Sequence, residues 1–141
     1  MKLLGALNGN KNTKPVWLMR QAGRHLPEYR ELRKRSGDLM KMFLNDDMVS
    51  QATLHPVERY GMDAAILFSD ILMVPYSLGS SLSFQEGGIG PVVKLVKLDN
   101  ELKQDLNLLK PVFNGITKIK KETQNKIPLI GFVGGVWTTI Y

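Results

Sequence analysis

Three compact apolar runs divide the chain and predict short strands. They cover residues 15–19, 64–68 and 128–133. Continuous apolar runs of this length are typical of parallel strands that are covered on both faces. We therefore expect a buried strand at each of these places.

Helical patterns fill the intervals between the runs. Residues 28–34 have helical composition, and Pro27 stands at a favourable first position. Downstream, residues 99–109 and 111–124 predict two more helices. Residues 82–96, with a glycine cluster at 87–91, predict a hairpin or excursion.

A further helix is predicted to follow an N-cap at Asp46 or Asp47 and to end near Tyr60. Gly61 would terminate it, since glycine readily adopts the left-handed conformation found at helix ends. Pro56 lies inside this stretch and is expected to kink or split the helix.

The order strand, helices, strand, helices, strand predicts an α/β protein with a parallel sheet. No linker divides the 141 residues, so a single domain unit is expected to span residues 1–141. The apolar run 3–7 is shorter than a signal-peptide core of roughly 7–15 residues. No stretch approaches the roughly 20 apolar residues that span a bilayer, so a cytoplasmic location is predicted.

Composition narrows the function classes. A hydrophobic fraction of 43% and a charged fraction of 23% are ordinary for a globular protein. The chain has no cysteine, which excludes disulfides, thiol chemistry and Cys-ligated zinc. The net charge is +6, and six of the Lys and Arg residues lie between Arg20 and Arg35. This cluster would attract anions, although basic residues do not alternate with aromatic ones as in RNA-binding proteins.

Arg20 and Arg24 are the first candidates for a binding site. They follow a predicted strand four residues apart, with Ala22 and Gly23 between them. On one helical turn the two guanidiniums would share a face, and in a loop the small residues would let a ligand approach the backbone. Planar guanidiniums can hold carboxylates through two hydrogen bonds each. Gln21 adds a neutral donor and acceptor.

Arg33 is a possible third anion contact. The alternative for these arginines is a surface ion-pair network with Glu28 and Glu31.

Asp70 stands at the carboxyl end of the second apolar run, directly after Ser69. In α/β folds this end of a strand faces the ligand crevice, so a carboxylate here is a candidate site residue. Asp is also a preferred helix-capping residue, and both interpretations stay open on local sequence. His25 and His55 lack the paired spacing of metal ligands.

Residues 15–30, PVWLMRQAGRHLPEYR, closely resemble the N-terminal signature of the uroporphyrinogen decarboxylase family. The resemblance continues through residues 64–72, AAILFSDIL, through Val74-Pro75, and through residues 129–132, LIGF. These segments stand in the family's order and at about its spacing.

The resemblance implies a (β/α)₈ barrel that removes the four acetate carboxyl groups of uroporphyrinogen to give coproporphyrinogen in haem biosynthesis. It implies neither cofactor nor metal, and neither a nucleic acid nor a membrane as partner. It also implies a homodimer when the protein is full length.

The same resemblance implies roles for individual residues. Arg20 and Arg24 would contact substrate carboxylates, and Asp70 would accept hydrogen bonds from the pyrrole N–H groups beneath the macrocycle. Arg20 has been considered as the proton donor, although a guanidinium gives up its proton reluctantly. Gln21, Arg33 and Ser69 would line the cleft.

Members of the family are more than twice as long as this chain, and their later strands supply a serine and a histidine to the cleft. At most three barrel strands are predicted here where eight close a barrel. The chain is therefore expected to be the N-terminal portion of a barrel and inactive alone. The alternatives are a corrinoid-linked methyltransferase of the same superfamily and a non-catalytic remnant that binds tetrapyrroles or other anions.

Overall fold

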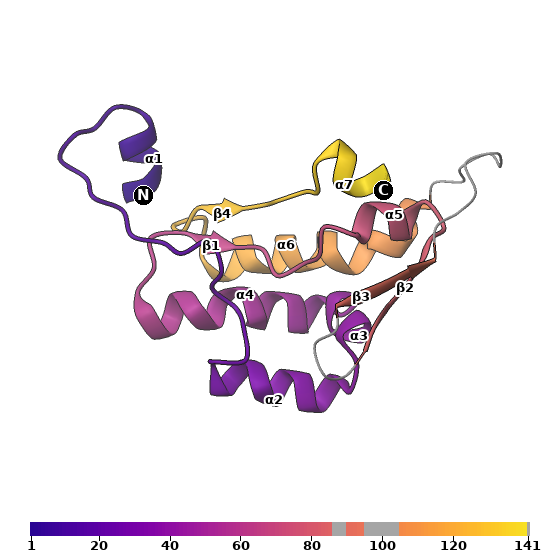
Figure 1. Ribbon diagram of the computed structural model, residues 1–141. Helices are drawn as coiled ribbons and strands as arrows, with labels where there is room; N and C mark the ends of the chain where they lie inside the picture. Colours follow the sequence, from indigo (N-terminus) through magenta and orange to yellow (C-terminus); the bar gives the residue numbers. More distant parts are fainter. Residues whose placement is uncertain (86–89, 95–104, 141) are drawn as a thin grey trace.

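A computed structural model describes residues 1–85, 90–94 and 105–140 of the chain (Figure 1). Its elements, in chain order, are α1 (Lys2–Leu7), α2 (Pro27–Ser36), α3 (Leu39–Phe43), α4 (Asp46–Tyr60), β1 (Ala65–Ile66), α5 (Met73–Ser77), β2 (Ser81–Phe84), β3 (Pro91–Lys94), the 3₁₀ turn η1 (Leu106–Leu109), α6 (Lys110–Glu122), β4 (Leu129–Ile130) and α7 (Val136–Ile140).

Strands β1 and β4, far apart in the sequence, form a parallel pair. Ala65 is opposite Leu129 and Ile66 is opposite Ile130. Parallel strands need a crossover connection, and α6 lies within it. Figure 1 shows α4 and α6 below the strand pair, with α2 beneath them. The predicted α/β class is confirmed, although both strands are shorter than their apolar runs.

The run at residues 15–19 is not the buried strand that its composition predicts. The structure assigns no strand there, and Val16, Leu18 and Met19 are largely exposed. The run lies beside the start of β1, where Val16 O accepts a hydrogen bond from Asp63 N at 2.9 Å. Burial of an apolar segment requires a partner on its outer side, and no described residue covers this one.

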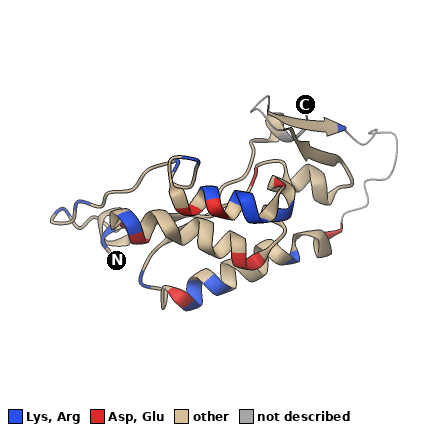
Figure 2. Ribbon diagram, turned by 90° about the horizontal axis from the view of Figure 1, so that it is seen from below, with Lys and Arg blue, Asp and Glu red and all other residues tan. Residues whose placement is uncertain are grey.

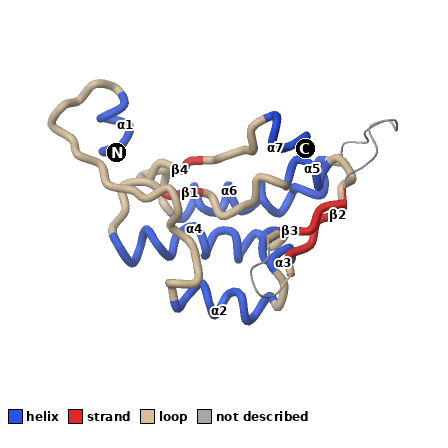
Figure 3. The backbone as a smooth tube through the Cα atoms, in the orientation of Figure 1, coloured by secondary structure: helices blue, strands red, loops and turns tan. Residues whose placement is uncertain are grey.

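The hairpin expected at residues 82–96 is confirmed in its described part. Strands β2 and β3 pair antiparallel, with Leu82 opposite Val93 (Figure 3). Much of the predicted helix 99–109 lies outside the described residues, and its end forms the turn η1. The predicted helix 111–124 is present as α6, beginning one residue earlier and ending at Glu122.

Helix α4 carries most of the packing against α6. Gly115 of α6 is buried against Val49 of α4, which brings the two helix backbones close together. Lys118 adds ion pairs across the same contact, to Asp46 Oδ2 at 2.8 Å and to Asp47 Oδ1 at 2.6 Å. Its hydrogen bond to Asp46 lowers the pKa of that carboxyl group.

The ends of α4 correct two expectations. Asn45, rather than Asp46 or Asp47, is the N-cap, and its side chain accepts a hydrogen bond from Met48 N at 2.9 Å. Gly61 ends the helix with φ 64°, as predicted. Pro56 does not split the helix, which runs unbroken from Asp46 to Tyr60, and the fully buried Pro56 ring is part of the core.

Replacing Asn45 by Ala is expected to lower the free energy of unfolding by about 1 kcal/mol, because the Met48 N–H loses its acceptor. Urea denaturation followed by circular dichroism measures the change. Asn114→Ala, at an exposed position within α6, is the control and is expected to have a much smaller effect. Equal losses in the two variants would contradict the capping role.

Figure 2 shows basic and acidic positions interleaved along the helices. In the described part of the chain, no helix has the length and apolar character needed to cross a bilayer.

Candidate functional site

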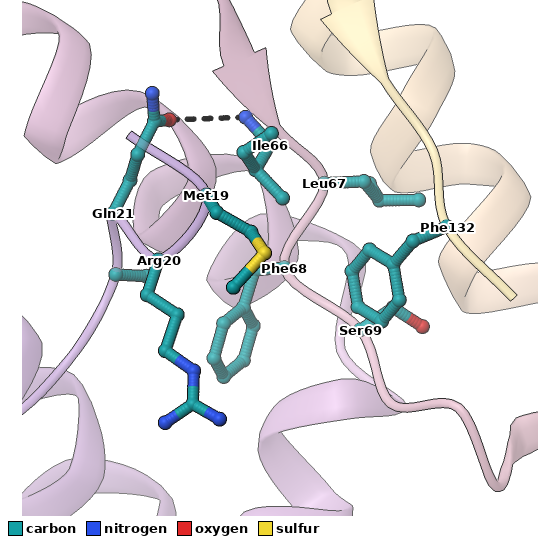
Figure 4. Close-up of a pocket in the computed structure, with 9 residues that line it drawn as sticks. Met19, Arg20, Gln21, Ile66, Leu67, Phe68, Ser69 and Phe132 are labelled. Atoms are coloured by element: carbon teal, nitrogen blue, oxygen red, sulfur yellow. Dashed lines mark hydrogen bonds between the residues drawn. The ribbon is translucent and has the colours of Figure 1, made fainter. Parts of the chain in front are cut away.

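A pocket of about 200 Å³ lies at the carboxyl ends of β1 and β4. One wall is the segment 19–22, a second is the segment 66–69 at the end of β1, and Phe132 after β4 closes the pocket (Figure 4). This is where ligands bind in parallel α/β folds, because loops that follow neighbouring strands converge there. The pocket joins the two stretches that the sequence singled out.

Arg20 lines this pocket, and its side chain extends past Phe68 in Figure 4. Within the described ranges, no acidic side chain forms an ion pair with Arg20, Arg24 or Arg33. Glu28 forms its ion pair with Arg59 of α4 instead. These arginines therefore do not form the alternative ion-pair network with Glu28 and Glu31. The Arg20 side chain is exposed to solvent.

Arg24 and Arg33 lie near Tyr29 and are not among the residues that line the pocket. Burial raises the pKa of Tyr29, and the positive charges of Arg33 and Arg24 oppose that rise. The Tyr29 ring meets Phe68 edge-on, with the ring centroids 5.7 Å apart. Arg33 Nη1 is buried without a hydrogen-bond partner in the described chain. Cationic groups therefore flank the aromatic wall of the pocket.

The segment that carries Arg20 and Arg24 is a loop with a turn, not a helix. Leu26 N donates to Gly23 O at 3.0 Å, and Arg30 Nη1 donates to Arg24 O at 2.9 Å. A Cβ atom on Gly23 would lie 3.2 Å from the His25 ring, so the small residue permits a tight chain path. Of the two geometries that the spacing allowed, the structure has the loop.

Gln21 is buried, with 3% of its surface exposed. Its Nε2 donates to Ala64 O at 2.8 Å, and its Oε1 accepts from Ile66 N at 3.0 Å. The side chain also lines the pocket, but these amide bonds are directed to the backbone of β1.

Ser69 lines the pocket, whereas Asp70, the next residue in the chain, is not among the lining residues. Asp70 Oδ1 accepts from Leu72 N at 2.8 Å, which closes a local turn ahead of α5. Its Oδ2 makes no hydrogen bond within the described ranges. The N-cap of α5 is Leu72 and not Asp70, so the expected capping role is not what the structure shows. One carboxylate oxygen holds the local turn, and the other is available to a ligand.

Two residues of this region, Thr53 and Phe68, are not among the site residues expected from the sequence. Thr53 is buried in α4, and its hydroxyl accepts from Phe68 N at 2.9 Å while donating to Val49 O at 2.7 Å. Phe68 packs against both apolar clusters of the core and also lines the pocket. Its place before Ser69 could have suggested the pocket role, whereas nothing marks Thr53.

The arrangement suits a flat, apolar ligand with carboxylates at its rim. Phe68, Leu67 and Phe132 supply apolar surface, and the Arg20 guanidinium can pair with a carboxylate.

Comparison with known proteins adds sequence relatives. A family model described as "Uroporphyrinogen decarboxylase (URO-D)" matches residues 2–141. The uroporphyrinogen decarboxylase of Chelativorans sp. (strain BNC1) is 45% identical over 97% of this chain, and that of Rickettsia africae is 41% identical over 99%. In each case the chain spans 41% of the relative's length.

A solved structure adds a likeness in fold. A methyltransferase from Methanosarcina mazei superposes with a TM-score of 0.74, over 98% of this chain and 42% of that one. The two sequences are 20% identical, so this likeness concerns the fold alone.

Proposed function

Because the chain belongs to the uroporphyrinogen decarboxylase family, we propose that it supplies the N-terminal part of a carboxy-lyase that converts uroporphyrinogen to coproporphyrinogen. The observation that carries the proposal is that Arg20 and Ser69 line the same pocket at the carboxyl end of β1. It brings together residues that are far apart in the sequence and that the family resemblance assigns to one cleft.

The chemistry needs no external electron acceptor. When a proton adds to a pyrrole ring carbon, the ring becomes an electron sink. The bond between the side-chain methylene and its carboxylate then breaks, CO₂ leaves, and the electron pair moves into the ring. A second proton then adds to the exocyclic carbon, and the first proton leaves the ring carbon, which restores the pyrrole and leaves a methyl group. Repetition on four acetate side chains gives coproporphyrinogen.

Asp70 is the residue that we assign to stabilising this ring cation. A carboxylate that accepts hydrogen bonds from pyrrole N–H groups holds its negative charge near the positive charge that develops during protonation. The free Oδ2 supports this role, since Oδ1 is already held by Leu72 N. The fixed turn keeps the carboxylate in place without reorganisation as the charge appears.

Arg20 and Arg24 are assigned to the substrate carboxylates, with Arg33 as a further cationic group. None of the three forms an ion pair in the described chain, and the exposed side chains of Arg20 and Arg24 are available to an anionic ligand, whereas Arg33 Nη1 is buried. Holding several carboxylates at once would orient the macrocycle over the Phe68 wall. Arg20 also stays a candidate for delivering the proton.

The barrel is proposed to be completed by residues like those in the remaining length of the relatives. Exposed apolar side chains on the strand side of the chain support this, among them Val16, Leu18, Met19, Phe132 and Val133. Apolar surface of this extent marks an interaction site when it stays uncovered. The completed barrel is proposed to form a homodimer.

The direct test combines the chain with a segment that would complete the proposed barrel. Residues 1–141 are produced alone and together with the remaining segment of the Chelativorans decarboxylase, and coproporphyrinogen formation from uroporphyrinogen is measured. We expect no turnover from the chain alone and turnover from the pair. Circular dichroism reports whether each sample is folded.

Activity of residues 1–141 alone would contradict the need for further strands. A folded pair that binds uroporphyrin, the stable oxidised form of the substrate, without turnover would favour a non-catalytic tetrapyrrole-binding protein. A folded pair that neither binds nor turns over would overturn the proposed function.

A further inference from the structure

We propose that Gln21 is a positioning residue whose side-chain amide takes the place of a neighbouring strand on β1 and thereby fixes Arg20 in the wall of the pocket that Ser69 also lines. The inference rests on the proposed function for the ligand concerned, but its geometric content is independent of that ligand. It assigns Gln21 to the architecture of the pocket instead of to contact with substrate.

The two edges of β1 are used differently. On one edge, Ala65 N donates to Pro128 O at 2.9 Å and Leu67 N donates to Ile130 O at 3.0 Å, as in any parallel ladder. The Ala64 carbonyl and the Ile66 N–H point to the opposite edge, where they are bonded by a side chain and not by a strand.

Gln21 meets that second edge with both halves of its amide. It donates to the carbonyl of Ala64 and accepts from the N–H of Ile66, which are the two groups that a neighbouring strand would bond. The next N–H on this edge, at Phe68, is accepted by Thr53 Oγ1. Side chains from the loop before α2 and from helix α4 therefore bond to this edge.

The segment that leads to Gln21 runs in the same direction as β1. Val16 is bonded to Asp63, through Asp63 N to Val16 O and through Val16 N to Asp63 Oδ2, each at 2.9 Å. Gln21 then bonds further along β1. The segment is thus held at two points, and Arg20 is directly beside the second one.

Burial argues against a primary role in ligand binding. An amide with 3% exposure needs its hydrogen bonds inside the protein, and β1 supplies them. If Gln21 bound substrate through the same atoms, the N–H of Ile66 and the carbonyl of Ala64 would lose their partners. Positioning is the role that satisfies all of these groups together.

The test uses three substitutions in residues 1–141. Gln21→Met keeps the length of the side chain and removes both bonds to β1. Gln21→Glu keeps an acceptor for Ile66 N and removes the donor to Ala64 O, and it replaces the Met variant if that variant does not fold. Thr53→Val is the matched control, because it removes the neighbouring bond on the same edge without touching the segment of Arg20.

The first readout is a distance measurement that needs no ligand. The chain has no cysteine, so spin labels can be attached at Leu18→Cys and Lys121→Cys, both exposed positions. Pulsed electron paramagnetic resonance is expected to give one narrow distance distribution for the parent and for Thr53→Val. Gln21→Met is expected to broaden it. An unchanged distribution in folded Gln21 variants would overturn the inference.

The second readout is uroporphyrin binding, measured by fluorescence in the assembled pair of segments. Gln21→Met is expected to weaken binding about tenfold, since a displaced cationic group loses its alignment with the ligand. In the Gln21→Met background, adding Arg20→Ala should then lower the affinity for uroporphyrin only slightly further. Fully additive losses would contradict positioning of Arg20.

The two readouts separate failure of the inference from failure of the proposed function. If the parent pair does not bind uroporphyrin, the proposed function fails, and the distance distributions still decide whether Gln21 positions the segment. If the parent binds and the Gln21 variants bind equally well, the inference fails alone.

Discussion

Replacing Asp70 by Asn is expected to lower kcat of the assembled decarboxylase by about 10²–10³-fold, because a charge aimed at the developing ring cation is lost. Asn retains a side-chain oxygen that can accept from Leu72 N, so the turn ahead of α5 is preserved. The change therefore tests the charge and not the fold. Single-turnover assays of coproporphyrinogen formation measure the loss.

The chain offers a matched control for this substitution. Asp105 Oδ1 accepts from Asn107 N at 2.9 Å in the same local geometry, but in an exposed turn away from the pocket. Asp105→Asn should leave kcat unchanged. If Asp70→Asn retained full activity while folded, Asp70 would serve only the local turn ahead of α5 and the catalytic assignment would be wrong.

Replacing Gly115 by Ala is expected to lower the free energy of unfolding by about 1–3 kcal/mol, the range found when extra methyl groups are forced into a packed core. The new Cβ would lie 2.7 Å from Val49 Cγ1 and 3.0 Å from Val49 Cβ. Helices α4 and α6 would have to move apart to relieve this contact. Urea denaturation measures the effect.

Combining Gly115→Ala with Val49→Ala tests whether the contact with Val49 causes the loss. Val49→Ala removes the methyl groups that the new Cβ would meet, so the double variant should lose less stability than the two single losses added together. Gly131→Ala is the control, since a Cβ there meets no atom within 4 Å. A loss at Gly131 equal to that at Gly115 would mean that close packing is not the cause.

Local signals in the sequence predicted helix positions well. Pro27 and Gly61 act through their own backbone preferences, so they mark the start of α2 and the end of α4 whatever surrounds them. The cap at Asn45 was misassigned because Asn45, Asp46 and Asp47 are three adjacent capping residues with similar preferences. Sequence alone does not order them.

The run at residues 15–19 was misjudged for a different reason. Its composition reports that it suits a buried place, but burial depends on which residues cover it. The relatives are more than twice as long as this chain. Composition alone therefore does not tell whether the described part of the chain supplies that cover.

The residues of the pocket likewise divide into those that the sequence predicts and those that it does not. Arg20 and Asp70 could be named as candidates from their places after apolar runs. Ser69 was expected in the cleft only from the family resemblance. The bonds from Gln21 and Thr53 to β1 could not be predicted, since each joins a side chain to backbone far along the chain. No local pattern encodes such a pairing.

The unequal edges of β1 bear on the order in which the chain is synthesised and folds. Gln21 and Thr53 both precede β1, so the partners of one edge are already made when Ala65 and Ile66 leave the ribosome. The other edge must wait for Leu129 and Ile130, after the hairpin and α6. Unpaired strand edges promote aggregation during such a delay. The two side chains would halve that exposure, by protecting one edge of a nascent strand before its parallel neighbour exists.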